Sequence, residues 1–171
     1  AVEHLVKLGH NRIACITNAA LSYTAAADRM SGYREVLATH GILYDESLVR
    51  YGDFDPDSGY QQMKDLLRTN KLPTAVFVAS DVVAIGAKAA IVEKGLRIPG
   101  DIALVGFDDI PLARYLDPPL TTVRLPASEL ATRASQMLVQ LINKDTPAEQ
   151  LVLLESQLIV RQSCGAGLPF H

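Results

Sequence analysis

The sequence predicts an α/β fold with a mostly parallel, open sheet and helices on both faces. Short apolar runs alternate with segments of helical periodicity over much of the 171 residues, which is the pattern of βαβ units. One run, 75–79, is apolar throughout, as in strands that are covered on both faces. Right-handed crossovers between parallel strands then place helices on both sides of the sheet.

Strands are expected where short apolar runs stand between turn residues. The runs are 12–17, 47–51, 75–79 and 102–106, and of these 47–51 carries the weakest pattern. Residues 121–124 form a further short extended piece.

Helices are expected before and between these strands. Residues 2–8 read as a helix that ends at Gly9. A second helix carries apolar residues at helical spacing and ends at Gly41, since glycine is favoured just after a helix. The residues at that spacing are Met30, Tyr33, Leu37 and His40.

Two more helices begin at aspartates. Asp55 is expected as an N-cap with Pro56 at the first helical position, and Tyr60, Met63 and Leu67 then share one face. Asp81 is expected to cap the next helix, which ends at Gly95. On that helix the pattern places three apolar residues inward: Ile85, Ala89 and Val92.

The last third of the chain differs from the rest. Pro126 is expected at the first position of a long amphipathic helix, followed by a linker with Asp145 and Pro147. Residues 152–160 alternate as a strand does, and 165–171 show no pattern. The apolar face of the long helix consists of Leu130, Ala134, Met137 and Leu141.

Composition excludes several classes of protein. Apolar residues make up 49% and charged residues 20%, and the net charge is −3, so the chain is neither disordered nor a basic protein that grips phosphates by itself. Neither a membrane span nor a signal peptide is visible. Cys15 and Cys164 are expected as buried thiols. The first residue is Ala1 rather than Met, so we expect a fragment or a processed product.

Polar groups follow each predicted strand, and the carboxyl ends of strands in open α/β sheets are where ligands bind. Taken singly, each has a structural alternative: Asp108 could cap its loop, Asp81 an N-terminus, and Phe54 could belong to the core. Arg29 could equally be ion-paired. Together they suit a pocket for a small polar molecule.

Enzyme signatures are absent from the sequence. It has no G-x-S-x-G elbow, no phosphate-binding loop and no dinucleotide fingerprint, and its four histidines are scattered. The adjacent Asp108 and Asp109 make a weak acid/base pair, because neighbours in an extended chain point in opposite directions. We therefore expect no enzyme, no cofactor and no metal site.

Specific strings resemble the lactose/galactose-repressor family over residues 2–161. The strongest segment runs from Gly95 to Ile110 and contains Gly106-Phe-Asp-Asp109. The others are Gly9-His-Asn-Arg-Ile-Ala14, Arg29-Met-Ser-Gly-Tyr33, Gly52-Asp-Phe54, Pro73-Thr-Ala-Val-Phe77, Ser80-Asp81 to Ala87 and Pro118-Pro-Leu-Thr-Thr-Val123.

The resemblance implies part of a bacterial transcription regulator whose effector-binding core has two α/β subdomains, as in periplasmic sugar receptors. Residues 1–124 and 155–162 would form the second subdomain. Residues 126–150 would belong to a first subdomain absent here, and 163–171 would be a tail. The helix from 126 would then expose an apolar face.

The resemblance also implies a ligand site. Arg29 and Asp108 match its ligand-binding arginine and aspartate, and Phe54 matches an aromatic that packs on the effector. Ser80 stands where Asn is common, and Tyr23 lies in a variable ligand loop. Residues 18–20 and Leu125 depart from the family pattern, so the effector could be a sugar or a nucleoside or purine.

The implied partners are a small-molecule effector, a second copy of the chain, and operator DNA through an absent N-terminal head. Residues 81–94 and 110–115 are the expected dimer contacts. We expect a cytoplasmic protein with no membrane partner. A periplasmic sugar-binding receptor and an α/β enzyme remain the alternative functions at this point.

Overall fold

A computed structural model describes residues 1–143 and 151–167. Its centre is a four-stranded parallel sheet in the order β2-β1-β3-β4. The order reverses between β1 and β3, which defines the topological switch point at which open α/β sheets bind ligands. The strands are β1 (Ile13–Thr17), β2 (Val49–Tyr51), β3 (Ala75–Val78) and β4 (Ala103–Val105).

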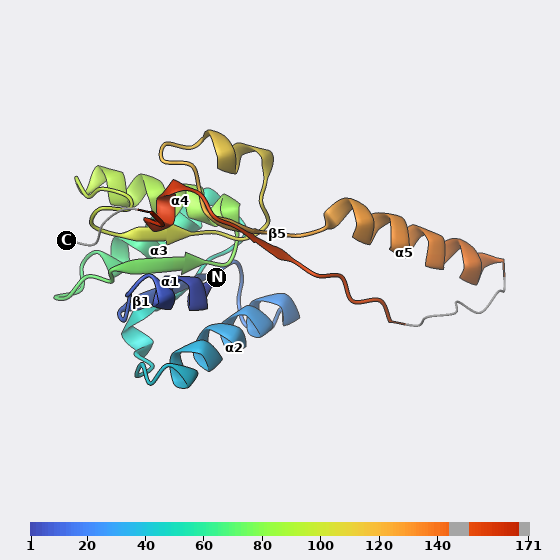
Figure 1. The fold of residues 1–171 in the computed structure, drawn as a ribbon, viewed down its shortest axis with the longest axis horizontal. Coiled ribbons are helices and arrows are strands. Elements are labelled where there is room, and N and C mark those ends of the chain that lie inside the picture. Colours follow the sequence, from blue (N-terminus) through green and yellow to red (C-terminus); the bar gives the residue numbers. More distant parts are fainter. Residues whose placement is uncertain (144–150, 168–171) are drawn as a thin grey trace.

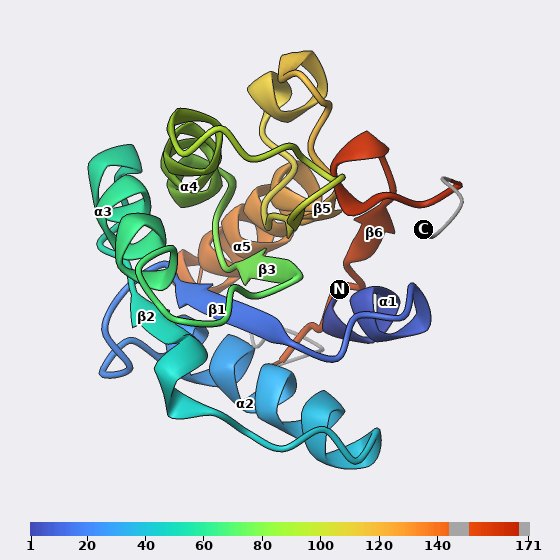
Figure 2. The same ribbon diagram turned by 90° about the vertical axis from the view of Figure 1, so that its left-hand side faces the viewer.

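Helices cover both faces of this sheet, which confirms the predicted fold class (Figures 1 and 2). Because side chains alternate along a strand, Ile13 and Cys15 pack in one core cluster and Ala14 and Ile16 in the other. The first cluster includes α1 (Val2–Lys7) and α2 (Thr24–Thr39), and the second includes α3 (Pro56–Leu66) and α4 (Asp81–Glu93).

A two-stranded antiparallel ribbon extends the fold beside β4. It consists of β5 (Thr122–Arg124) and β6 (Gln157–Ile159). The Gly106 amide donates to the Thr121 carbonyl at 2.8 Å, so β5 docks where β4 ends. Short 3₁₀ turns complete the described chain: η1 (Glu46–Leu48), η2 (Pro111–Tyr115) and η3 (Gln162–Cys164).

The remaining helix, α5 (Ala127–Ile142), projects away from the sheet (Figure 1). None of its residues is buried, and Leu130 and Leu141 are exposed, so the predicted exposed apolar face is confirmed. The helix begins one residue later than predicted, since Pro126 is its N-cap rather than its first residue. The predicted linker residues Asp145 and Pro147 lie outside the described residues.

The predicted role of Asp81 as an N-cap is wrong. Ser80 is the N-cap of α4, and the buried Asp81 side chain instead accepts hydrogen bonds from the Thr122 hydroxyl at 2.6 Å and the Ile110 amide at 3.0 Å. The carboxylate therefore joins α4 to β5 and to the loop after β4. The cap predicted at Asp55 is confirmed, because its carboxylate accepts from the Ser58 amide at 2.8 Å.

The inward face predicted for α4 is also wrong. Ala89 and Val92 are exposed and Ile85 is only partly buried. A different side of α4 packs against α3 and the sheet, and its core face is formed by Val83, Ala84, Ala87, Ala90 and Ile91.

Two predicted segment boundaries differ from those in the structure. Only Val49–Tyr51 of the run 47–51 is a strand, because the preceding residues form η1. Ser163 and Cys164 are buried rather than part of a tail. The Ser163 hydroxyl donates to the Leu104 carbonyl at 2.6 Å and accepts from the Thr121 amide at 2.8 Å, which fixes η3 against the sheet.

Candidate functional site

Three of the predicted site residues converge at the carboxyl edge of the sheet. Arg29 lies in α2, Ser80 caps α4, and Asp108 follows β4. The Arg29 guanidinium donates to the Ala79 carbonyl at 2.7 Å and lies 3.9 Å from the ring centroid of Phe107. These contacts hold the arginine beside the loop that carries Asp108.

Burial sets the electrostatics of this group. It raises the pKa of Asp108, while Arg29 and a hydrogen bond from the Ser80 side chain oppose the rise. Burial also lowers the pKa of Arg29, and Asp108 opposes that change. Among the ion pairs of residues 1–143 and 151–167, none joins Arg29 directly to Asp108. Both charges therefore keep hydrogen-bonding capacity for a polar ligand.

The backbone of the Asp108 loop is unusual. Asp108 has φ of 117° and Asp109 has φ of 55°, a region that favours glycine. Such conformations cost on the order of 1–3 kcal/mol each and cluster at functional sites. The Asp108 amide donates to the Val123 carbonyl at 2.8 Å, so β5 supports the strained loop.

The two predicted aromatic residues form a second group. The rings of Tyr23 and Phe54 meet edge to face, with centroids 5.5 Å apart and an interplanar angle of 83°. They are 57% and 53% exposed, so together they present an apolar wall to solvent. Phe54 also has a positive φ, 55°, and its amide donates to the Asn18 carbonyl at 2.8 Å, which links the wall to the end of β1.

Asn18 was not among the predicted site residues. It is 6% exposed, and its side-chain oxygen Oδ1 is buried without a hydrogen-bond partner. A buried acceptor left unpaired costs about 1–3 kcal/mol, so its presence needs a reason. Its position directly after β1, at the switch point, was the sequence signal that could have identified it.

A hollow of about 300 Å³ opens beside Arg29 and Phe107. Its walls include Ala1, Val123 and Ser156, which belong to three separate stretches of the chain. The start of α1, strand β5 and the segment before β6 therefore come together next to the candidate site.

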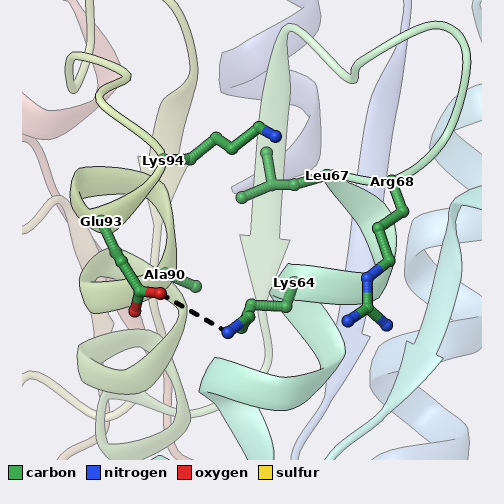
Figure 3. Close-up of a pocket in the computed structure, with 6 residues that line it drawn as sticks. All are labelled: Lys64, Leu67, Arg68, Ala90, Glu93 and Lys94. Carbon is green, nitrogen blue, oxygen red and sulfur yellow. Dashed lines mark hydrogen bonds and ion pairs between the residues drawn. The ribbon is translucent and has the colours of Figure 1, made fainter.

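A second hollow, of about 240 Å³, lies between α3 and α4 (Figure 3). It is lined by residues at the C-terminal ends of the two helices. In βα units these ends lie at the opposite edge of the sheet from the candidate site. The Lys64–Glu93 ion pair, at 3.5 Å, spans it. Its cations complement the negative ends of two helices, which accounts for them without a ligand. They are Lys64, Arg68 and Lys94.

Within residues 1–143 and 151–167, no group of three His, Cys, Asp or Glu side chains could hold a metal ion. Among the helices of residues 1–143 and 151–167, none combines the length and the apolar character that a membrane span requires.

The chain matches the periplasmic binding protein-like domain over residues 2–164. It is 39% identical to the HTH-type transcriptional regulator CelR of Thermobifida fusca over 163 residues, which are 95% of this chain and 48% of CelR. The chain thus spans about half the length of this curated relative.

Solved structures agree with the sequence comparison. A CelR–cellobiose complex superposes with a TM-score of 0.89 at 38% identity and covers 95% of this chain and 50% of that one. A lac repressor dimer bound to operator and the anti-inducer ONPF gives a TM-score of 0.87 at 36% identity, covering 95% and 48%.

The fold thus defines a periplasmic-binding-protein-like domain, with a parallel sheet whose carboxyl edge carries the candidate site. More narrowly, the chain belongs to the lactose/galactose-repressor (LacI) family of transcriptional regulators.

Proposed function

We propose that this chain is the effector-binding and dimerisation part of a bacterial transcriptional regulator. The observation that carries the proposal is the convergence of Arg29, Ser80 and Asp108 at the switch-point edge of the sheet, with the unpaired Oδ1 of Asn18 at the end of the neighbouring strand β1. The site holds charges and hydrogen-bonding groups, which suit the binding of a small polar ligand.

The ligand of this site is a small polar molecule, either a sugar or a nucleoside or purine. An arginine and an aspartate can hydrogen-bond to hydroxyl or ring N–H groups, and the Tyr23–Phe54 wall can pack on a sugar or base face. The relative CelR has been solved with cellobiose, which favours the sugar.

Residues 1–124 and 155–162 form one subdomain in this proposal, and 126–150 belong to another. Two observations support the division. Helix α5 has no buried residue, so its apolar face lacks a core of its own. Val123 and Ser156 line one hollow, so the chain leaves the subdomain before α5 and returns to it at neighbouring points. The effector then lies in the cleft between the two subdomains.

Binding would act through a population shift. A ligand that contacts both subdomains stabilises their closed arrangement by its differential affinity. Closure changes the affinity of a separate DNA-binding head for its operator, and operator binding changes ligand affinity by the same factor. Such a regulator works in the cytoplasm, where its DNA is.

The dimer surface in this proposal combines α4 with η2, which lie side by side in Figure 2. The two elements expose apolar side chains that the core leaves uncovered: Ala89, Val92, Leu112 and Tyr115. A two-fold dimer would bury them, and a similar lac repressor structure is a dimer. Light scattering after size exclusion should give a dimer that Val92→Glu converts to a monomer, whereas Leu43→Glu, at an exposed site elsewhere, should not.

A thermal-shift panel tests the ligand proposal. Cellobiose, monosaccharides, purine bases and nucleosides are each added to this chain at millimolar concentration. A ligand that binds only the folded state raises the midpoint of unfolding. We expect one class of compound to raise the midpoint of unfolding. Asp108→Asn should abolish this rise, whereas the control substitution Asp65→Asn should leave it unchanged. Stabilisation that survives Asp108→Asn would contradict the proposed site.

A further inference from the structure

One carboxylate joins the ends of both strands of the β5–β6 ribbon. The Asp109 side chain is only 4% exposed and accepts from the Arg124 guanidinium at 2.7 Å and from the Arg161 guanidinium at 2.5 Å. Arg124 is the last residue of β5, and Arg161 follows β6 by two residues. Because the strands are antiparallel, with Arg124 opposite Gln157, the two arginines lie at opposite ends of the ribbon, and Asp109 forms a triad with both.

The two arginines of the triad are not equivalent. The Arg161 side chain is 14% exposed and also donates to the Leu120 carbonyl at 2.7 Å, so it is an inner partner. The Arg124 side chain is 50% exposed and forms the outer pair. Burial alone would raise the pKa of Asp109, but the hydrogen bonds from Arg161 and Arg124 outweigh it and lower the pKa. Asp109 is therefore charged at neutral pH.

The triad is contiguous with the candidate ligand residue. Asp109 directly follows Asp108, and both carry positive φ angles, so the position of one backbone unit constrains the other. The Asp108 amide donates to the Val123 carbonyl of β5, and the amide of Ile110, the residue after Asp109, donates to the buried Asp81 carboxylate. The loop that presents Asp108 is thus fixed to β5, to β6 and to α4.

We propose that Asp109 is a positioning residue that couples the Asp108 loop to β5 and β6. The ribbon leads into α5, which the proposed function assigns to another subdomain, so the inference about ligand coupling rests on that function. A ligand that hydrogen-bonds to Asp108 then changes the position of the β5–β6 ribbon through Asp109. In the same way, a movement of the ribbon changes the position of the Asp108 side chain. A carboxylate that merely stabilised the fold would not connect the two.

The connection is testable without any ligand. The Asp108 amide, whose acceptor is Val123 of β5, and the Arg161 amide, which donates to the Thr121 hydroxyl at 2.8 Å, report on ribbon docking by hydrogen exchange. The Ala79 amide donates to the Ile16 carbonyl at 2.8 Å and serves as the core reference. Two-dimensional ¹H–¹⁵N NMR of this chain is the measurement that follows all three amides.

Two variants remove parts of the triad. Arg124→Gln leaves the inner Asp109–Arg161 pair and so preserves the fold, whereas Asp109→Asn removes both pairs and leaves Arg161 without its carboxylate. The matched control is Arg97→Gln, which breaks an exposed ion pair of 2.8 Å to Asp101. It makes the same charge change outside the triad.

The expected result for Arg124→Gln is exchange at Asp108 and Arg161 that is roughly threefold to tenfold faster, with unchanged exchange at Ala79. The Asp108 amide resonance should also move, further in Asp109→Asn than in Arg124→Gln, and stay in place in Arg97→Gln. If Arg124→Gln leaves exchange and shift at Asp108 unaltered, or if all three amides accelerate together, Asp109 only stabilises the fold and the inference is wrong. Since no ligand is added, that outcome is independent of whether the thermal-shift panel finds one.

Discussion

Gly59 and Gly86 lie where α3 and α4 cross, and each makes room for the backbone of the facing helix. A Cβ atom on Gly86 would lie 1.7 Å from the Pro56 carbonyl oxygen, and one on Gly59 would lie 2.0 Å from that of Val83. Neither oxygen can yield without moving a helix. This close approach sets the distance between α3, which begins shortly after Phe54, and α4, whose N-cap is Ser80.

Gly86→Ala should therefore lower the free energy of unfolding by about 3 kcal/mol or more, because overpacking here displaces backbone rather than a flexible side chain. Gly32→Ala is the matched control in α2, where a Cβ meets nothing within 4 Å. Alanine there should raise the free energy by roughly 0.5–1 kcal/mol, since it has the better helix propensity. Urea unfolding measures both, and equal effects of the two substitutions would contradict the close crossing.

Asp81 should make stability depend on pH. Burial, the leading cause, raises its pKa to about 6, although hydrogen bonds from Thr122 and Ile110 oppose the rise. The folded state then holds a proton that the unfolded state, with a pKa near the ordinary 3.8, has released. The stabilising contribution is present below about pH 4 and is lost as pH rises through about 6, by up to about 3 kcal/mol.

Asp81→Asn removes this titration while keeping the shape of the side chain. The free energy of unfolding of the variant, relative to that of the unmodified chain, should increase between pH 4 and pH 7. Urea titrations at four pH values measure the difference. A difference that stays constant over this range would show that Asp81 does not titrate there.

Asn18 is expected to contribute to ligand binding at a cost in the free energy of unfolding. Asn18→Ala removes the unpaired buried oxygen, so the free energy of unfolding should stay equal or rise by up to about 1 kcal/mol. The same change should weaken binding of the ligand found in the thermal-shift panel by roughly fivefold or more, if that ligand donates to Oδ1. The exposed Asn70→Ala should alter neither quantity. Loss of stability in Asn18→Ala would show that Asn18 has a structural role instead.

The parallel sheet and its helices could be predicted because they depend on local pattern. The runs at 75–79 and 102–106, the cap at Asp55 and the glycines after helices each act within a few residues, and the structure has strands or helix ends at these places. Residues on the rim of the site could be predicted as a group, because parallel strands end at one edge of a sheet.

The larger errors involve partners distant in sequence. Asp81 bonds to Thr122, 41 residues away, and Ser163 bonds to Leu104, 59 residues away, so neither burial was visible locally. The inward face of α4 was wrong because the helix is apolar on several sides, and only the close packing of α3 decides which side is covered. The Asp109 triad was missed for the same reason, since Arg161 is 52 residues away.

The central claim is that the carboxyl edge around Arg29, Ser80 and Asp108 binds a small polar effector. The most direct test is an NMR titration of the ¹⁵N-labelled chain with cellobiose and, in parallel, with a purine nucleoside. This method detects even weak binding to a site that only one of two subdomains contributes. We predict saturable shifts at Asn18, Arg29, Ser80 and Asp108 with one of the two compounds, and none with Asp108→Asn. Saturable shifts confined to the hollow between α3 and α4, with this edge unmoved, would contradict the account.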